Sequence, residues 1–154
     1  NCENWQKEVI NILKQAEANG TNLEHLVICN PRRESFSIDD PDASEKQIAW
    51  EYKWLNSADI FSMYFTSGES VQPICMYELG RNVYRMIVLY NNYANRRIVI
   101  SVEDGYKRTQ DVILQMKMVN KFIKVDTNAT PQKHAEKIIE RYNDLTSLLE
   151  SISF

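Results

Sequence analysis

Residues 59–83, DIFSMYFTSGESVQPICMYELGRNV, contain the junction that decides the fold. The segment DIFSMYF is a short apolar run rich in aromatic side chains, which is typical of a buried strand. The segment TSGESV has the composition of a loop. Pro73 then suits the first turn of a helix, where its missing N–H costs nothing, so we expect a helix from Pro73 to about Tyr93 with Gln72 at its cap.

Strand and helix patterns alternate along the rest of the chain. We expect strands near residues 26–29, 59–65, 97–102 and 121–126. This order predicts one domain, residues 1–154, with an α/β, three-layer, flavodoxin-like fold in which helices cover both faces of a parallel sheet. Such a sheet normally opens with a strand, whereas this sequence opens with a helix. We therefore expect the first, central strand to be missing from the given sequence.

The helices have recognisable ends. Asn19-Gly20 predicts the end of the first helix, and Ser44 with Gln47 predicts a capping box at the start of the second. Residues 107–120 have a helical pattern, and Thr130-Pro131 opens the last helix.

Composition narrows the classes of partner and location. The chain has a net charge of −3 and scattered Lys and Arg residues, so a nucleic-acid polymer is not an expected partner. No apolar run reaches the eighteen or so residues that a membrane helix needs, and no signal peptide is visible, so we expect a cytoplasmic protein without membrane contact. Three cysteines without a C-x-x-C pair predict neither a disulfide framework nor a zinc site. His25 and His134 lack metal-ligand spacing and are expected at the surface or at helix ends, and no metal or cofactor is expected.

Glu78 lies inside the helix that Pro73 opens, among apolar residues. A buried carboxylate without a partner is too costly to remain ionised, so this side chain faces either solvent or a pocket. Its neighbour Tyr77 is expected in the core. The position in the helix alone does not decide between a solvated glutamate and a functional one.

Sites of open α/β sheets lie beyond the carboxyl ends of the strands, which directs attention to the loops. Arg32, beside Arg33 in a long loop, either clamps an anion or is solvated. Asp59, at the start of a strand, is either a local backbone cap or a substrate contact. Gly68 alone falls short of a phosphate-loop motif and predicts a tight turn. The candidate substrate-binding residues of this loop and of the helix start are Ser67, Gly68, Ser70 and Gln72, since helix N-termini attract phosphate groups.

Three stretches carry a resemblance to a known family: NPRR at 30–33, WEYKWLNSADIF at 50–61 and QPICMYELGRNV at 72–83. They resemble the nucleoside 2-deoxyribosyltransferase superfamily, including the related 2'-deoxynucleoside 5'-phosphate N-hydrolases, over nearly all of the chain. The resemblance implies that Glu78, in the Glu-Leu-Gly segment, is the nucleophile. It also implies that Glu51, eight positions before Asp59, contacts the sugar, although the hydrolases usually have Asp there. The Gly-Thr that precedes the glutamate in the transferases is absent, so base specificity does not carry over.

The function implied by the resemblance is cleavage or exchange of the N-glycosidic bond of 2'-deoxynucleosides or their 5'-monophosphates. A carboxylate at the anomeric carbon stabilises an oxocarbenium-like transition state and then forms a covalent sugar ester, as in retaining glycosidases. The alternative is a catalytically inactive nucleotide-binding module of the same fold. Members of the family form dimers or larger assemblies, and we expect a homo-oligomer. The apolar residues expected on the exposed face of the helix from Pro73 are Met76, Tyr84, Met86 and Tyr90.

Overall fold

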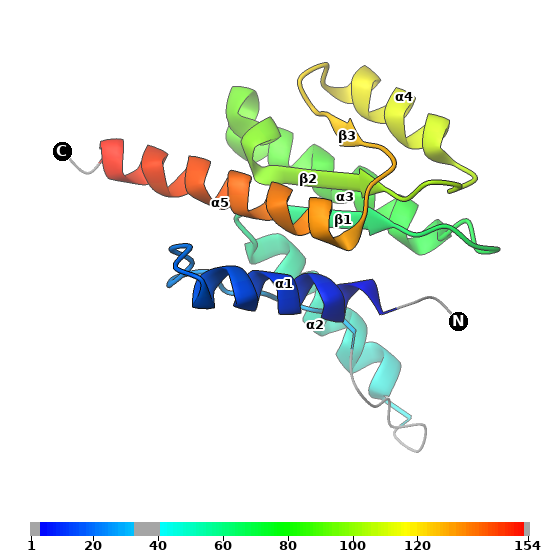
Figure 1. Cartoon of the computed structure of the whole chain (residues 1–154). Coiled ribbons are helices and arrows are strands. Elements are labelled where there is room, and N and C mark those ends of the chain that lie inside the picture. The colour runs from blue at the N-terminus through cyan, green and yellow to red at the C-terminus, as the bar shows by residue number, and fades with distance from the viewer. Residues whose placement is uncertain (1–3, 33–40, 153–154) are drawn as a thin grey trace.

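The computed structural model of the chain describes residues 4–32 and 41–152. The elements in these ranges are α1 (Trp5–Ala18), α2 (Ala43–Ser57), β1 (Phe61–Phe65), α3 (Pro73–Tyr90), a 3-10 segment η1 (Asn91–Arg97), β2 (Ile98–Val102), α4 (Thr109–Val119), β3 (Val125–Asp126) and α5 (Pro131–Ile152). The strands form a parallel sheet in the order β1-β2-β3. Helices lie on both sides of this sheet, with α5 in front of it and α3 behind it in Figure 1. The α/β class and the three-layer arrangement are confirmed.

The two faces of the sheet follow from the period of two in a strand. Alternate side chains of β1 and β2 enter the main core, which α3 and α4 complete: Phe61, Met63, Phe65, Ile98, Ile100 and Val102. The remaining positions include Ser62, Tyr64 and Ser101, whose side chains face α5. A second, smaller core joins α1 to α5 around Val9, Leu13 and Ala135. The sheet therefore has one strictly apolar face and one that includes polar side chains.

Local signals in the sequence set most of the helix ends. Gly20 follows Asn19, the C-cap of α1, and has a φ of +95°, as is typical of a helix-ending glycine. Pro73 is the first residue of α3, and Gln72 precedes it with a φ of +49°. The Gln72 side chain makes no capping bond and instead donates to the Thr66 carbonyl at 2.7 Å. The Thr130 hydroxyl accepts the Lys133 N–H at 3.3 Å and so caps the start of α5.

The strand expected at 26–29 is wrong. These residues have no strand structure, and Val27 is 79% exposed. Among the described residues no strand pairs with the edge of β1 away from β2, so this apolar segment has no sheet neighbour to satisfy its backbone. The strand expected at 121–126 is reduced to Val125–Asp126, because Asn120 closes a turn by accepting the N–H groups of Phe122 and Ile123.

The capping box expected at Ser44 and Gln47 is also wrong. α2 begins at Ala43, with Asp42 at its cap, and Gln47 lies inside the helix. α3 ends at Tyr90, three residues before the expected end, and the chain continues as η1. None of the described helices is long and apolar enough to cross a membrane.

The outer face of α3 differs from the expected one. Met86 is fully buried, and Met76 and Tyr90 pack partly against the main core, whereas Tyr84 is exposed as expected. Tyr77, which was expected in the core, is 68% exposed, because it lies about 200° around the helix from the buried Leu79. The exposed apolar residues of α3 are Ile74, Tyr77, Tyr84, Val88 and Leu89.

Candidate functional site

Glu78 lies in the second turn of α3, at the border of the buried face. The next residue, Leu79, is buried, and Asn82, one turn later, is fully buried and donates from Nδ2 to the Glu78 carbonyl at 2.8 Å. The Glu78 side chain itself is half-buried. Its carboxylate accepts no hydrogen bond from any residue in the described ranges. The helix therefore sets the position of the Glu78 backbone, and no hydrogen bond from the described residues fixes its carboxylate.

Two arginines of α3 fix this helix to α2. Arg81 donates from Nη2 to the Asn56 Oδ1 atom at 3.3 Å, and Arg85 donates to the Asn56 carbonyl. The Arg81 guanidinium also lies over the Tyr52 ring, 4.4 Å from its centroid. Because Tyr52 follows Glu51 directly, these contacts bring the middle of α2 beside the second turn of α3.

The charge of Glu51 acts on Glu78 across this interface. Burial raises the pKa of the Glu78 carboxyl above its ordinary value, the negative charge of Glu51 raises it further, and the positive charge of Arg81 lowers it. A site that cleaves a glycosidic bond usually contains two carboxyl groups in different environments. One attacks the anomeric carbon, and the other binds the sugar or transfers a proton. The structure thus brings together the two residues expected to be catalytic.

Glu51 is held from the other side by Gln47. Gln47 Nε2 donates to Glu51 Oε1 at 2.6 Å and to the Pro31 carbonyl at 2.8 Å. Asn30 Oδ1 accepts the Arg32 N–H at 3.0 Å, so the chain turns at this point. The described part of the loop, which ends at Arg32, therefore lies near Glu51. Arg33 lies outside the described residues.

The loop after β1 forms a second group of polar residues. Glu103, one residue beyond β2, accepts both the Ser67 N–H at 2.6 Å and the Ser67 hydroxyl at 2.7 Å through Oε2. Ser70 Oγ accepts the Gln72 N–H at 3.1 Å. Gly68 has a φ of +139°, which a residue with a side chain rarely adopts, in agreement with the expected tight turn. This loop lies at the carboxyl ends of β1 and β2 and leads into α3.

Asp59 lies at the other end of β1. It precedes the strand, its side chain is 81% exposed, and its Oδ1 pairs with the Arg97 Nη1 atom at 3.3 Å. Ile60 and the five residues of β1 separate it from Thr66, and the strand alone spans roughly 17 Å. The structure does not bring Asp59 together with the other candidate residues, and its contact with Arg97 is a structural one.

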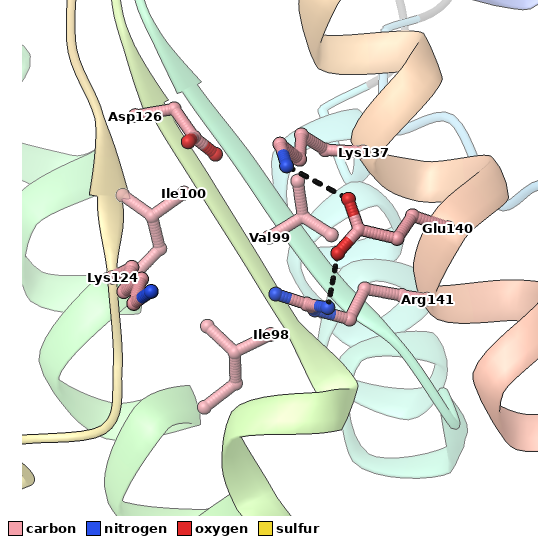
Figure 2. A pocket seen from close by; sticks show the side chains of 8 residues that line it. All are labelled: Ile98, Val99, Ile100, Lys124, Asp126, Lys137, Glu140 and Arg141. Atoms are coloured by element: carbon pink, nitrogen blue, oxygen red, sulfur yellow. Dashed lines mark hydrogen bonds and ion pairs between the residues drawn. The ribbon is translucent and has the colours of Figure 1, made fainter.

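Two concave regions lie away from Glu78. Figure 2 shows a cavity of about 100 Å³ between β2, the segment around β3 and α5, in which Glu140 lies between Lys137 and Arg141 at 2.7 and 2.9 Å. This volume is small beside the several hundred Å³ of a typical ligand pocket. A groove of about 340 Å³ lies between α1 and residues 23–28 and is mainly apolar. Neither region includes Glu78 or Glu51, so neither is the site for a sugar at Glu78.

The sequence did not single out three residues that shape the site: Gln47, Arg81 and Glu103. Gln47 was interpreted as part of a capping box. Glu103 had a detectable signal, because an acidic residue directly after the apolar strand 98–102 lies where α/β sites are built. Arg81 had none, since an arginine on a helix is usually solvated. Within residues 4–32 and 41–152 no group of His, Cys, Asp and Glu side chains has the arrangement of a metal site.

Comparison with known families gives a match to one of them. A family model described as "nucleoside 2-deoxyribosyltransferase like" matches residues 1–106, which include α1, α2, β1, α3 and β2. No curated protein and no solved structure matches the chain. The matched region contains Glu51, Glu78 and the loop after β1. The chain belongs to the nucleoside 2-deoxyribosyltransferase-like family.

Proposed function

We propose that this protein cleaves or exchanges the N-glycosidic bond of 2'-deoxynucleosides or their 5'-monophosphates. A carboxylate oxygen of Glu78 attacks the anomeric carbon of the sugar while the bond from that carbon to the base nitrogen breaks. The base leaves with the bonding electron pair and takes up a proton. Water or a second base then attacks the same carbon and releases the Glu78 carboxylate.

The observation that carries this proposal is the state of the Glu78 carboxylate. It is half-buried, accepts no hydrogen bond from the described residues, and has a pKa raised first by burial and then by the charge of Glu51. A structural glutamate in a helix normally pairs with a cation or points into solvent. An unpartnered, partly desolvated carboxylate is instead suited to attack an electron-poor carbon, because little solvation is lost on approach.

Glu51 has the supporting role in this proposal. Its Oε1 atom accepts a hydrogen bond from Gln47, one turn earlier on α2, which restricts the side chain. Its second carboxylate oxygen remains for a sugar hydroxyl or for proton transfer to the departing base. A 2-deoxy sugar suits the reaction, since no electron-withdrawing 2-hydroxyl opposes positive charge at the anomeric carbon.

The test is incubation of the purified protein with deoxynucleosides and deoxynucleotides, with and without an acceptor base, followed by chromatography. Release of free base in water indicates a hydrolase, and a new deoxynucleoside in the presence of the acceptor indicates a transferase. Mass spectrometry of the quenched protein should detect a deoxyribosyl group on the peptide that contains Glu78. Absence of base release under all these conditions would support the alternative of an inactive binding module.

We also propose that the protein self-associates through the outer face of α3. Ile74, Tyr77, Tyr84 and Val88 are each more than 60% exposed and are spaced by three, seven and four residues, which places them along one stripe of the helix. Exposed apolar patches of this kind usually mark interfaces. Light scattering at micromolar concentration should give at least twice the mass of one chain, and Tyr84→Lys should reduce it. A wild-type mass of one chain would contradict the proposal.

A further inference from the structure

The outer face of α4 is apolar, whereas the outer face of a surface helix is normally polar. Val112 and Met116 are buried in the main core, which defines the inner face of the helix. Leu114 and Met118 lie on the opposite side, about 200° and 240° around the helix from Val112, and are 50% and 80% exposed. Phe122, in the turn after α4, is 58% exposed. A helix that is apolar on both sides is normally covered on both sides, and among the described residues only the inner side is covered.

Two lysines lie beside these apolar side chains. Lys117 directly precedes Met118, and Lys121 directly precedes Phe122. The Lys121 ammonium lies 5.1 Å from the centroid of the Phe122 ring. Both lysines are exposed, and neither forms an ion pair within the ranges that the structure describes. The α4 patch is the surface formed by Leu114, Lys117, Met118, Lys121 and Phe122.

The segment that contains the patch is basic, although the chain as a whole has a net charge of −3. Residues 107–122 contain four Lys or Arg residues and one carboxylate, Asp111, which already pairs with Arg108 at 2.9 Å. The same patch on a second copy would bring like charges together. A partner for the α4 patch must therefore cover apolar side chains and carry negative charge.

The shape of the patch and the type of cation favour a membrane surface as this partner. Figure 1 shows α4 along one edge of the molecule, on the side away from α1. Neither of the two concave regions described above includes a residue of the patch. Lysine is a flexible point charge, whereas arginine has the fixed planar geometry that suits individual carboxylates. The lysine stem can also lie along apolar surface while its ammonium group reaches lipid phosphates.

We infer that the α4 patch binds the surface of a membrane that contains anionic lipids. Met118 and Phe122 enter the headgroup region, and the two lysines lie near the lipid phosphates. The helix lies along the membrane and does not cross it. The expectation of a protein without membrane contact rested on the lack of a spanning run and of a signal peptide, neither of which a surface contact requires. The patch lies outside residues 1–106, which the family model matches, and the contact is independent of the reaction proposed for Glu78.

The experiment measures co-sedimentation of the full chain with phosphatidylcholine vesicles and with vesicles that also contain about 30% phosphatidylserine. Partitioning onto the anionic vesicles should be at least about tenfold stronger. Lys117→Glu combined with Lys121→Glu should reduce it by about tenfold, because two cations become anions. The matched control combines Lys7→Glu with Lys14→Glu, the same charge change at exposed positions of α1, and should reduce it by less than about twofold.

The apolar part of the contact has its own variant and control. Met118→Gln should reduce partitioning by about threefold, and Ile48→Gln, at a residue of α2 that is 65% exposed, should not change it. Circular dichroism checks that each variant is folded. Raising the salt to about 0.5 M should release the wild-type chain without any substitution.

Several results would overturn the inference. These are no binding to anionic vesicles, equal binding to both kinds of vesicle, and an equal loss in the α1 control. A light-scattering mass that falls by half in Met118→Gln would make the patch a contact between copies. Binding of soluble polyglutamate in place of the vesicles would indicate an acidic protein as the partner.

Discussion

The helices on the two sides of the sheet each carry a polar side chain, and these two side chains differ in whether they have hydrogen-bond partners. On the α5 side, His134 is fully buried between Ser62, 2.8 Å from Nε2, and Ser101, 2.7 Å from Nδ1. The Trp5 and Tyr64 rings pack against it, with their centroids 5.9 and 5.3 Å from the centroid of the imidazole ring. On the α3 side, Glu78 is half-buried, and its carboxylate accepts no hydrogen bond from the described residues.

Under the proposed function, the difference separates a polar group that stabilises the fold from one that reacts with the substrate. Both ring nitrogens of His134 have partners, and burial lowers its pKa to about 4, so the ring is neutral near neutral pH. A satisfied, neutral group joins β1, β2 and α5 at low cost. The positive charge of Arg81 only partly offsets the effects of burial and of Glu51 on the Glu78 carboxyl, and a carboxyl with a perturbed pKa is a candidate for a functional site.

The largest expected effect concerns Glu78, the proposed reactive group in this comparison. Glu78→Gln should reduce base release by about 10³-fold or more, because the nucleophile is lost. The melting temperature at neutral pH should stay the same or rise, since the raised pKa of Glu78 means that its ionised form destabilises the folded state at that pH. The measurements are initial rates and thermal unfolding at pH 7.

Glu150→Gln, a change at an exposed glutamate of α5, is the control and should leave both quantities unchanged. Base release by Glu78→Gln at the wild-type rate would show that Glu78 is not the nucleophile.

Glu51→Gln should have a smaller effect on rate and a distinct effect on pH dependence. The rate should fall by roughly 10²-fold, as for loss of a group that assists proton transfer. The charge of Glu51 raises the pKa of Glu78, so its removal lowers that pKa, and the acid limb of the kcat profile should move to lower pH. Glu45→Gln, at an exposed residue of the same helix, should leave the profile in place. An unmoved acid limb in Glu51→Gln would mean that the two carboxylates are not coupled.

The buried His134 predicts that the fold loses stability in acid. The unfolded chain binds a proton at a histidine below about pH 6.5, whereas folded His134 does so only near pH 4. Stability should therefore fall as the pH decreases through this window, by up to about 3 kcal/mol from this group. Urea unfolding at several pH values measures this loss. His134→Gln should remove that part of the pH dependence, and His25→Gln, at an exposed position, should retain it.

The smallest expected effect concerns the partners of His134. Ser62→Ala leaves one ring nitrogen without a partner and should lower the free energy of unfolding by about 1–2 kcal/mol, with no effect on the chemistry. Ser57→Ala is the matched control, because the Ser57 hydroxyl donates to the Lys53 carbonyl at the exposed end of α2. Its effect should stay within about 0.5 kcal/mol. Equal effects of the two substitutions would show that the buried contact contributes nothing specific.

The parts of the fold that could be predicted from the sequence depend on local chemistry. Pro73, Gly20 and Pro131 act on the backbone within one turn, so their positions fixed helix ends that the structure confirms. Residues 26–29 have an equally apolar sequence, but a strand requires a neighbouring strand, and the sequence of a segment does not contain its neighbour. The same reason explains why Gln47 was misassigned, since its partner Pro31 is sixteen residues away.

For the candidate site, the two carboxylates could be proposed from the sequence, but the residues that contact them could not. Glu78 and Glu51 were identified by resemblance, and the contacts that set their environment come from Arg81 and Gln47. His134 was expected at the surface or at a helix end, and it lies near the start of α5 but has no exposed area. A signal for its burial existed: Ser62 and Ser101 each interrupt an apolar strand, and hydroxyls in such strands require a polar partner.

The position of His134 makes it a reporter of whether the sheet is assembled. Whichever ring nitrogen carries the proton, that N–H is held by a serine on β1 or β2 and is shielded from water. Exchange of this proton with solvent requires α5 to separate from both strands, so its resonance should persist in the folded protein and vanish when the layer opens. The chain has two histidines, and the other, His25, is exposed, so a slowly exchanging imidazole N–H resonance identifies this one contact.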